Sequence, residues 1–431
     1  MTQTNAKPIV KLEIDALSYG PYGIGRIDGK AVMVPRTTPG DQIEARISDS
    51  KDRYAIGEIV RLLRSSSSRQ APPCPYVDAC GGCSWQHIKY GAQLKAKEQS
   101  VGDALRRIGK IQDFELRPII GSALEYRYRR RIRLQIGADK RLGFFGPSSH
   151  QLVEVDACLI ADDRINQVIN ALQSWVRSIA TAVEHIEIVT GDESNQLVAL
   201  ARGHGAFLSN DAAACEKMIG IDGPLDGLIL RGEAWRKGWG QTSLAVRLSN
   251  SMSLTVEADV FTQINADANR HILEELLRAG EFTNSERVLE LFCGAGNFTL
   301  PIARQTRQVV AVEGYQPAVA SGKRNAAKYS IENIRWICSP VPRAVAQLKH
   351  RRERFDTIVL DPPRAGAKAL ESELATLGAK KILYVSCNPT TLARDVAVLA
   401  KHGYKLRMAQ PVDMFPQTFH VETLALLARQ I

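Results

Sequence analysis

One cysteine stands where its chemistry could matter. Cys387 directly follows a run suited to a buried strand, Ile382 to Ser386, and Asn388-Pro389 ends that run before the helix-like segment TTLARDVAVLA. A thiol in this place can simply pack in the core, since free cysteine is among the most buried residue types. It can also act as a nucleophile, because a helix N-terminus stabilises a thiolate and lowers its pKa. The rest of the chain has to distinguish the two.

Three further cysteines lie close together at a spacing typical of metal ligands. The stretch CPYVDACGGCSWQH contains Cys74, Cys80 and Cys83, with two glycines that let the loop fold tightly. Three thiols need a fourth, and Cys158 in LVEVDACLIAD is the natural candidate. Four thiolates suit either zinc or an iron–sulfur cluster, and the spacing alone does not choose between them.

A glycine turn after a strand predicts a nucleotide-type site. VLELFCGAGNFTL has a strand, a turn at Gly294 and Gly296, and the start of a helix. Glu313 comes 19 residues after Gly294, where an acidic residue can bond ribose hydroxyls. NAD and S-adenosylmethionine both fit this pattern. Thr299 in place of a third glycine, and Glu290 before the turn, favour S-adenosylmethionine, which has no pyrophosphate to bind.

The motif DPPR, Asp361 to Arg364, follows the strand-like FDTIVL. A proline pair fixes the backbone beyond a strand end and presents neighbouring groups to a flat ligand. Enzymes that methylate amino groups place an aromatic residue after Asp-Pro-Pro. Arg364 in that place argues against adenine or cytosine amino chemistry. Cytosine-C5 chemistry on RNA would call for a cysteine within the motif, which has none.

The elements from residue 261 onward must position these residues. Short apolar strands alternate there with amphipathic helices; the strands are RVLELF, QVVAVE, IRWIC, FDTIVL, KILYVS, YKLRMA and TLALLA. The alternation predicts a Rossmann-like, doubly wound, mostly parallel sheet with helices on both faces. Ligands of such sheets bind at the carboxyl ends of the strands, where Cys387, Asp361 and Glu313 stand.

Three domains are expected in a multidomain α/β chain of this length. Strand-like segments such as VKLEIDAL and KAVMVP predict an OB-like five-stranded β-barrel over residues 8–66. The segment RSSSSRQAPPCP then marks a linker. A central mixed α+β domain with the cysteine site is expected over residues 67–260, and the doubly wound domain over residues 261–431.

Composition predicts a cytoplasmic protein with an anionic partner. Of the 431 residues, 45% are hydrophobic and 24% charged, with no apolar run that would span a bilayer and no signal-peptide pattern. In a reducing compartment the eight cysteines are metal ligands or reactive thiols rather than disulfides. The net charge of +10 indicates an anionic partner, nucleic acid being the usual one.

The stretch EYRYRRRIRLQI is a candidate contact for RNA. Its arginines at every second position are Arg127, Arg129, Arg131 and Arg133. On a strand they would share one face and form a basic stripe at phosphate-like spacing. The neighbouring Tyr126 and Tyr128 could stack on bases. A solvated strand face without RNA is the equally weighted alternative.

Five motifs together resemble the RNA uracil-C5 methyltransferase family. They are FTQIN (261–265), ELFCGAGNFTLPIA (290–303), LDPPRAG (360–366), VSCNPTTLARD (385–395) and DMFPQTFHVETLALL (413–427). The N-terminal β-domain resembles the TRAM domain, and the cysteine cluster is similar to that of the family's iron–sulfur subset. The combination of a TRAM-like domain and such a cysteine cluster is most similar to that of the family members that act on 23S ribosomal RNA.

This resemblance implies a specific chemistry and a set of roles. A thiolate that adds to C6 of uracil makes C5 able to attack the sulfonium methyl of S-adenosylmethionine, and a base then removes the C5 proton. Cys387 would be the nucleophile and Glu422 the base. The cofactor or the base would be contacted by Gln263, Phe292, Asn297, Glu313 and Asp361. A 4Fe-4S cluster would be held by Cys74, Cys80, Cys83 and Cys158.

Alternatives remain at this stage. The same chemistry on transfer RNA is one, and a catalytically inert iron–sulfur RNA-binding protein is another. Intact Cys387, Glu422 and Asp361 weigh against the inert protein, because an inert fold need not keep all three. The target base has to leave its stack to reach Cys387, so a single-stranded loop or a flipped nucleotide is expected. A monomer is the default expectation, and no membrane partner is expected.

Overall fold

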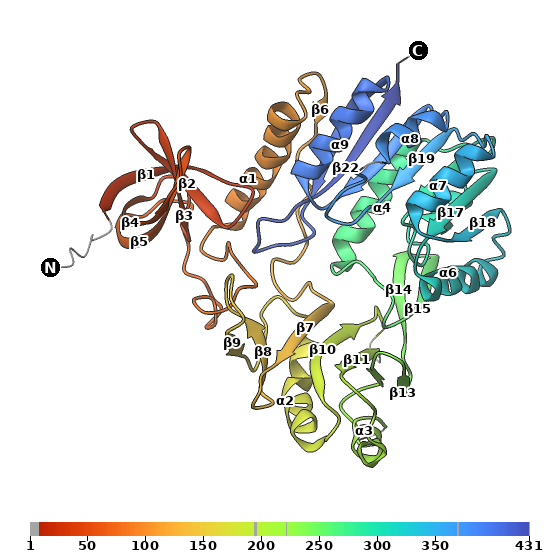
Figure 1. Ribbon diagram of the computed structural model, residues 1–431, viewed down its shortest axis with the longest axis horizontal. Helices are drawn as coiled ribbons and strands as arrows, with labels where there is room; N and C mark the ends of the chain where they lie inside the picture. The colour runs from red at the N-terminus through yellow and green to blue at the C-terminus, as the bar shows by residue number, and fades with distance from the viewer. Residues whose placement is uncertain (1–7, 194–195, 221, 369, 431) are drawn as a thin grey trace.

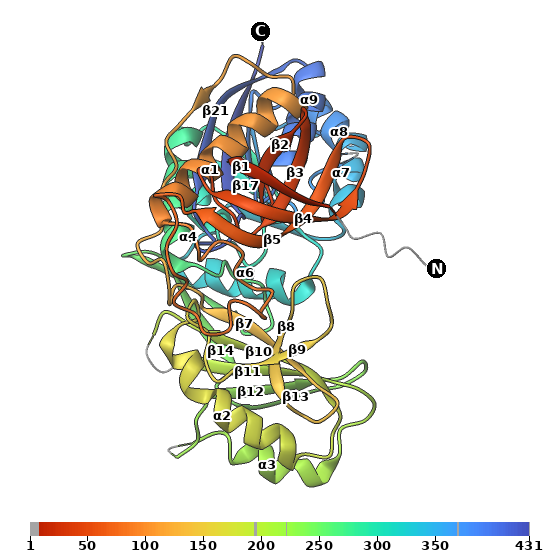
Figure 2. The ribbon, with the colours of Figure 1, turned by 90° about the vertical axis from the view of Figure 1, so that its left-hand side faces the viewer.

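The computed structural model describes residues 8–193, 196–220, 222–368 and 370–430. The described residues form a closed barrel, a seven-stranded sheet, a two-stranded hairpin and an eight-stranded sheet (Figure 1). In Figure 2 the barrel lies in front of the C-terminal sheet and the seven-stranded sheet lies below both. Within the described ranges, no helix combines the length and the apolar character needed to cross a membrane.

The predicted N-terminal barrel is confirmed. It closes in the strand order β1-β2-β3-β5-β4. Its strands are β1 (Ile9–Leu17), β2 (Tyr22–Ile27), β3 (Lys30–Pro35), β4 (Gln42–Ser50) and β5 (Tyr54–Arg64). Alternate side chains point inward, as the period of a strand requires. They form a small core of Leu12, Ile14, Val32, Val34, Ile43, Ala45 and Ala55.

After the barrel, the chain packs against the C-terminal domain before it enters the central region. Helix α1 (Tyr90–Asp103) continues into one π-helical turn (Ala104–Ile108), which packs against a C-terminal helix. The short strand β6 (Glu115–Leu116) pairs with the edge of the C-terminal sheet. Residues 90–116 therefore pack with the C-terminal domain, although they lie within the segment expected to form the central domain.

The central region is a seven-stranded sheet in the order β13-β12-β11-β10-β7-β8-β9. Its strands are β7 (Arg131–Ile136), β8 (Leu142–Phe145), β9 (Leu152–Glu154), β10 (Val183–Thr190), β11 (Leu197–Gly203), β12 (Gly227–Arg231) and β13 (Arg236–Gly240). The apolar side of the amphipathic helix α2 (Asp163–Ser178) buries one face of this sheet, together with α3 (Ala212–Glu216). This arrangement is the mixed α+β region that the sequence predicts.

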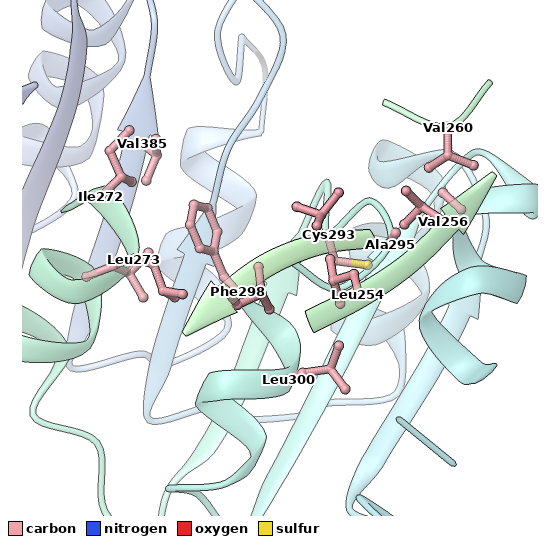
Figure 3. Close-up of a cluster of buried hydrophobic side chains, with 14 of the residues drawn as sticks. Leu254, Val256, Val260, Ile272, Leu273, Cys293, Ala295, Phe298, Leu300 and Val385 are labelled. Carbon is pink, nitrogen blue, oxygen red and sulfur yellow. The ribbon is translucent and has the colours of Figure 1, made fainter. Parts of the chain in front are cut away.

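A hairpin joins the central region to the C-terminal domain. Strands β14 (Ser243–Ser249) and β15 (Met252–Glu257) pack on the helices of that domain. Figure 3 shows Leu254 and Val256 of β15 gathered with Cys293 and Ala295 of the glycine turn. The hairpin thus covers the turn that carries the expected cofactor site.

The C-terminal domain is an eight-stranded sheet in the order β18-β17-β16-β19-β20-β22-β21-β6. The strands β16 to β20 run parallel to one another, and β22 is antiparallel to both of its neighbours, β20 and β21. The strands after β15 are β16 (Arg287–Leu291), β17 (Gln308–Glu313), β18 (Ile334–Cys338), β19 (Thr357–Leu360), β20 (Lys381–Ser386), β21 (Tyr404–Val412) and β22 (Glu422–Arg429).

Helices cover both faces of this sheet, as expected for a doubly wound domain. One face packs on α4 (Ala266–Gly280), α5 (Thr299–Ala303) and α6 (Gln316–Lys328). The other face packs on α1 and on α7 (Val341–His350), α8 (Glu371–Thr376) and α9 (Pro389–Lys401). All seven strands expected from the apolar runs are present, and the carboxyl ends of the parallel strands form the edge at which the candidate residues meet.

Candidate active site

The register of the sheet brings the predicted residues to one edge. In neighbouring strands Leu291 is opposite Leu360, and Leu360 is opposite Tyr384. Residues that follow these parallel strands therefore gather at one edge, with Cys387 two residues beyond the position level with Asp361. They are Phe292 after β16, Asp361 after β19 and Cys387 after β20, with Glu313 at the end of β17. The prediction that these residues share the carboxyl edge of the sheet is confirmed.

Glu422 reaches the same edge from the opposite direction. Strand β22 runs antiparallel to β20, and Ser386 is opposite Thr423. The next residue of each strand, Cys387 and Glu422, is thus brought next to the other. Glu422 is only 3% exposed, whereas Cys387 is half-buried. A thiol and a buried carboxyl group therefore lie together at the end of the sheet.

The pair has an unusual electrostatic environment. Burial, and then the charge of Glu422, raise the pKa of the Cys387 thiol to about 11, while Arg364 opposes the rise. Burial and the charge of Asp361 raise the pKa of Glu422 well above its ordinary value, again against Arg364. Burial also raises the pKa of Asp361 to about 7. Acidic groups that hold their protons this strongly are typical of functional sites.

The expectation that a helix N-terminus lowers the thiol pKa is wrong for this arrangement. Helix α9 begins at Pro389, and the Asn388 side chain accepts hydrogen bonds from the amides of Thr390 and Thr391 at 3.0 and 3.5 Å. The cap therefore uses the first free amides of the helix. Burial and the neighbouring carboxyl groups outweigh what remains of the helix dipole at Cys387.

A small pocket lies beside this pair. Its volume is about 50 Å³, and among its lining residues are Gln263, Phe292, Asn297 and Asp361, four of the five residues expected to contact the cofactor. The Gln263 amide donates to Asp361 Oδ2 at 3.3 Å. Asn297 and Asn269 exchange two amide hydrogen bonds at 2.9 and 3.0 Å, which fixes the Asn297 side chain at the pocket wall.

The glycine turn has the conformation that its sequence requires. Gly294 and Gly296 have φ angles of 55° and 98°, which glycine adopts without strain. Phe292 has a φ of 62°, which is rare for a bulky side chain and is found mainly where function demands it. Glu313, the fifth expected cofactor residue, is held at the turn by the amides of Gly294 and Tyr315 at 3.0 and 2.8 Å.

Glu290 is a site residue that the sequence analysis used only to choose between cofactors. It is 2% exposed, lines the pocket, and has one carboxyl oxygen, Oε2, without a hydrogen-bond partner among the described residues. Burial first, and then the charges of Asp361 and Glu313, raise its pKa to about 8. The feature of the sequence that could have identified Glu290 as a site residue is its position as an acid inside the otherwise apolar strand RVLELF.

The segment that leads to Glu422 is held from two sides. Lys97 on α1 donates to Asp413 Oδ1 at 2.6 Å and to the Phe415 carbonyl at 3.0 Å, and both charged side chains are fully buried. The Gln417 carbonyl accepts from the amide of Trp85 at 3.0 Å. Helix α1 and the end of the cysteine loop thus fix the path of residues 413–421.

The four predicted cysteine ligands come together. Cys74, Cys80, Cys83 and Cys158 line one cavity of about 220 Å³. Burial, and then the neighbouring thiols, raise the pKa of Cys83 to about 12, with Gln86 opposing. Yet within the described ranges no three cysteine, histidine or acidic side chains are grouped closely enough to hold a metal ion. The thiols surround a space rather than a single point.

The predicted arginine stripe is wrong. Strand β7 begins only at Arg131, so Arg127, with a φ of 58°, and Arg129 lie outside it. Arg131 and Arg133 both pair with Glu187 on the neighbouring strand. Tyr128, one of the expected stacking residues, is also buried, and its hydroxyl donates to the Pro416 carbonyl at 3.0 Å. Residues 125–136 thus mainly make contacts within the fold, such as the ion pairs to Glu187 and the Tyr128 hydrogen bond.

A solved structure shares this architecture over nearly the whole chain. It is the tRNA (uracil-54, C5)-methyltransferase of Pyrococcus abyssi in complex with S-adenosyl-L-homocysteine, with a TM-score of 0.73 and 22% identity. The match covers 97% of this chain and 100% of that one. This fold, together with the uracil-5-methyltransferase family model that the C-terminal domain matches, defines the class: a methyltransferase that depends on S-adenosylmethionine.

Sequence comparisons lead from the class to the family. Residues 237–430 match the model described as tRNA (Uracil-5-)-methyltransferase, and residues 9–60 match the TRAM domain. The 23S rRNA (uracil(1939)-C(5))-methyltransferase RlmD of Aeromonas hydrophila is 34% identical over 428 residues, 98% of this chain and 96% of that one. An uncharacterized RNA methyltransferase of Halalkalibacterium halodurans is 29% identical over 98% of this chain and 97% of its own length. The chain belongs to the RNA uracil-C5 methyltransferase family, as its motifs predict.

Proposed function

We propose that this protein methylates C5 of a uridine in 23S ribosomal RNA, with S-adenosylmethionine as methyl donor. The observation that carries the proposal is Cys387 beside buried Glu422 at the edge that also holds the carboxylate-lined pocket. The full-length similarity to enzymes named for 23S rRNA supports ribosomal RNA as the substrate. Transfer RNA, named for the Pyrococcus abyssi enzyme, is the second candidate.

The two residues divide the reaction between them. The Cys387 thiolate bonds to C6 of the uracil ring, which makes C5 enolate-like and able to accept a methyl group. S-adenosylmethionine, when bound, supplies that group from its sulfonium centre. Glu422 then takes the proton from C5, the bond between C6 and sulfur breaks, and the thiolate is released. The uracil gains one methyl group and one proton is released overall.

The carboxyl groups of the pocket fit a cationic cofactor. Glu290 has an unpartnered buried oxygen, and its pKa and that of Asp361 are both raised. A sulfonium and an ammonium charge would favour their ionised forms and would also lower the pKa of the nearby thiol. Gln263, Phe292, Asn297 and Glu313 complete the proposed cofactor site. Cofactor binding would thus prepare the nucleophile for addition.

For the four cysteines we propose a 4Fe-4S cluster rather than zinc. The choice rests on the resemblance of the cysteine motif to the family's iron–sulfur subset, since among the described residues no group is close enough to hold either metal site. A cavity of about 220 Å³ lined by four thiols fits a body with several metal atoms. Methyl transfer needs no electron transfer, so the proposed role is to hold the RNA-binding parts in place.

The cluster proposal has its own test. Anaerobically purified protein should contain iron and acid-labile sulfide, and Cys80→Ala should lose both together with RNA affinity while S-adenosylmethionine still binds. Cys215→Ala, which changes a buried cysteine of α3 outside the cavity, is the matched control. Zinc in place of iron would reject the cluster, and unchanged RNA affinity of Cys80→Ala would reject the positioning role.

The substrate is tested with unmodified transcripts. 23S rRNA and tRNA transcripts are incubated with the protein and S-adenosylmethionine that carries a labelled methyl group, and their nucleosides are analysed by mass spectrometry. Labelled 5-methyluridine in the ribosomal RNA alone is the expected result. The label in tRNA alone would support the second candidate. Tight RNA binding without any labelled nucleoside would instead favour the inert iron–sulfur RNA-binding protein.

A further inference from the structure

A residue of the N-terminal barrel reaches the catalytic cysteine. Tyr19 lies in the turn between β1 and β2, and its hydroxyl donates a hydrogen bond to the carbonyl oxygen of Cys387 at 2.9 Å. The two residues are 368 positions apart in the chain. The bond meets the backbone where β20 has ended at Ser386 and α9 has not yet begun at Pro389. This is the peptide that carries the proposed nucleophile.

The Tyr19 ring is fixed in a definite orientation. It packs edge-on against Phe419, with centroids 5.5 Å apart, and against His420 at 6.4 Å. Both partners belong to the segment that leads to Glu422. The turn itself is tight, because the amide and the hydroxyl of Ser18 both donate to the Tyr22 carbonyl, at 2.9 and 3.0 Å. Tyr19 therefore contacts the surroundings of both catalytic residues at once.

The barrel does not need Tyr19 to stay attached. Arg36 donates to the Asp78 side chain and to the Val77 carbonyl in the cysteine loop. His87 Nε2 lies 3.2 Å from the Thr37 carbonyl. These contacts are made by the β3–β4 turn, not by the turn that carries Tyr19. Loss of one hydroxyl should leave the barrel docked, so its effect should be confined to the active site.

We propose that Tyr19 is a positioning residue, through which the barrel holds the Cys387 peptide and Phe419–His420 in the geometry that uracil addition requires. This inference rests on the proposed function and deepens it. The barrel would thus serve catalysis directly, beyond any contact it makes with RNA. Because a misplacement on the order of 1 Å can cost about a hundredfold in rate, a single hydrogen bond to this peptide matters.

The first test compares Tyr19→Phe with Tyr22→Phe in the full-length protein. The first change removes only the hydroxyl that bonds to Cys387. The second removes a hydroxyl from the end of the same turn, one that has no hydrogen bond to any described residue. We expect kcat for Tyr19→Phe to fall about tenfold, the equivalent of one hydrogen bond. KM for RNA and for S-adenosylmethionine should stay unchanged, and Tyr22→Phe should match the wild type.

The second test does not depend on activity. Hydrogen–deuterium exchange of the peptide that spans residues 387–392 should be faster in Tyr19→Phe than in wild type and Tyr22→Phe, with the barrel strands unaffected. Unchanged exchange, or a wild-type kcat, would overturn the inference. Faster exchange in a protein whose wild type methylates no RNA would support the positioning role and reject the proposed function instead.

Discussion

The raised pKa of Cys387 predicts how its reactivity depends on pH. With a pKa of about 11, about one thiol in a thousand would be ionised at pH 8. Since the thiolate is the reactive form, alkylation of Cys387 should be slow at pH 8 and should keep rising up to about pH 11. Cys338 is exposed and lies outside the catalytic pair, so it serves as the internal reference in the same protein.

The charge of Glu422 is the second cause of this shift, after burial. Glu422→Gln should therefore move the alkylation profile of Cys387 to lower pH, while burial should keep its midpoint above the ordinary value of about 9.0. The assay is alkylation with iodoacetamide at a series of pH values, followed by peptide mass spectrometry. The cationic cofactor analogue sinefungin should shift the profile in the same direction, and neutral S-adenosylhomocysteine should shift it less.

Two results would refute the reasoning. One is a Cys387 profile with its midpoint below that of Cys338, which would show that the helix N-terminus outweighs burial and the carboxyl groups. The other is a profile that Glu422→Gln leaves unchanged, which would show that the carboxyl group does not act on the thiol. A change in the Cys338 profile would show that the substitution has altered the fold more widely.

Further predictions concern the groups around the site. Lys97→Met leaves the buried Asp413 carboxylate without its ion-pair partner, so the free energy of opening α1, measured by hydrogen exchange, should fall by about 3–5 kcal/mol. The double variant with Asp413→Asn should recover much of this loss. Equal exchange in the wild type and both variants would contradict this prediction. Glu290→Gln removes a buried carboxyl group from the pocket. In calorimetry it should weaken the binding of S-adenosylmethionine more than the binding of S-adenosylhomocysteine. Equal loss of affinity for the two ligands would show that the charge is not the cause.

Much of the site follows from the order of apolar runs alone. Once RVLELF, QVVAVE, FDTIVL and KILYVS are assigned to one parallel sheet, the residues after them must share an edge, and this places Asp361 and Cys387 together. Glu422 could not be placed in this way. Its position depends on β22 running antiparallel with Thr423 opposite Ser386, and only the motif resemblance pointed to it.

Other features depend on contacts that no local pattern encodes. The hydroxyl of Tyr19 meets the Cys387 carbonyl only because the barrel docks on the C-terminal domain. The sequence pattern of helix α1 did not predict that the Lys97 side chain would be buried against Asp413. The arginine stripe misled because its alternation suggested a strand, whereas the backbone is not in a strand before Arg131. Burial and the charges of Glu422 and Asp361 likewise raise the pKa of the Cys387 thiol, opposite to the effect expected of the helix N-terminus.

The most direct test of the central claim is to trap the covalent intermediate. RNA fragments that carry 5-fluorouridine are incubated with the protein and S-adenosylmethionine, because fluorine at C5 blocks proton removal and stops the reaction after methyl transfer. We predict a protein–RNA adduct that survives denaturing gels, maps to Cys387 by mass spectrometry, and is absent from Cys387→Ala. No adduct with any ribosomal or transfer RNA despite tight binding, or an adduct that persists in Cys387→Ala, would contradict the account.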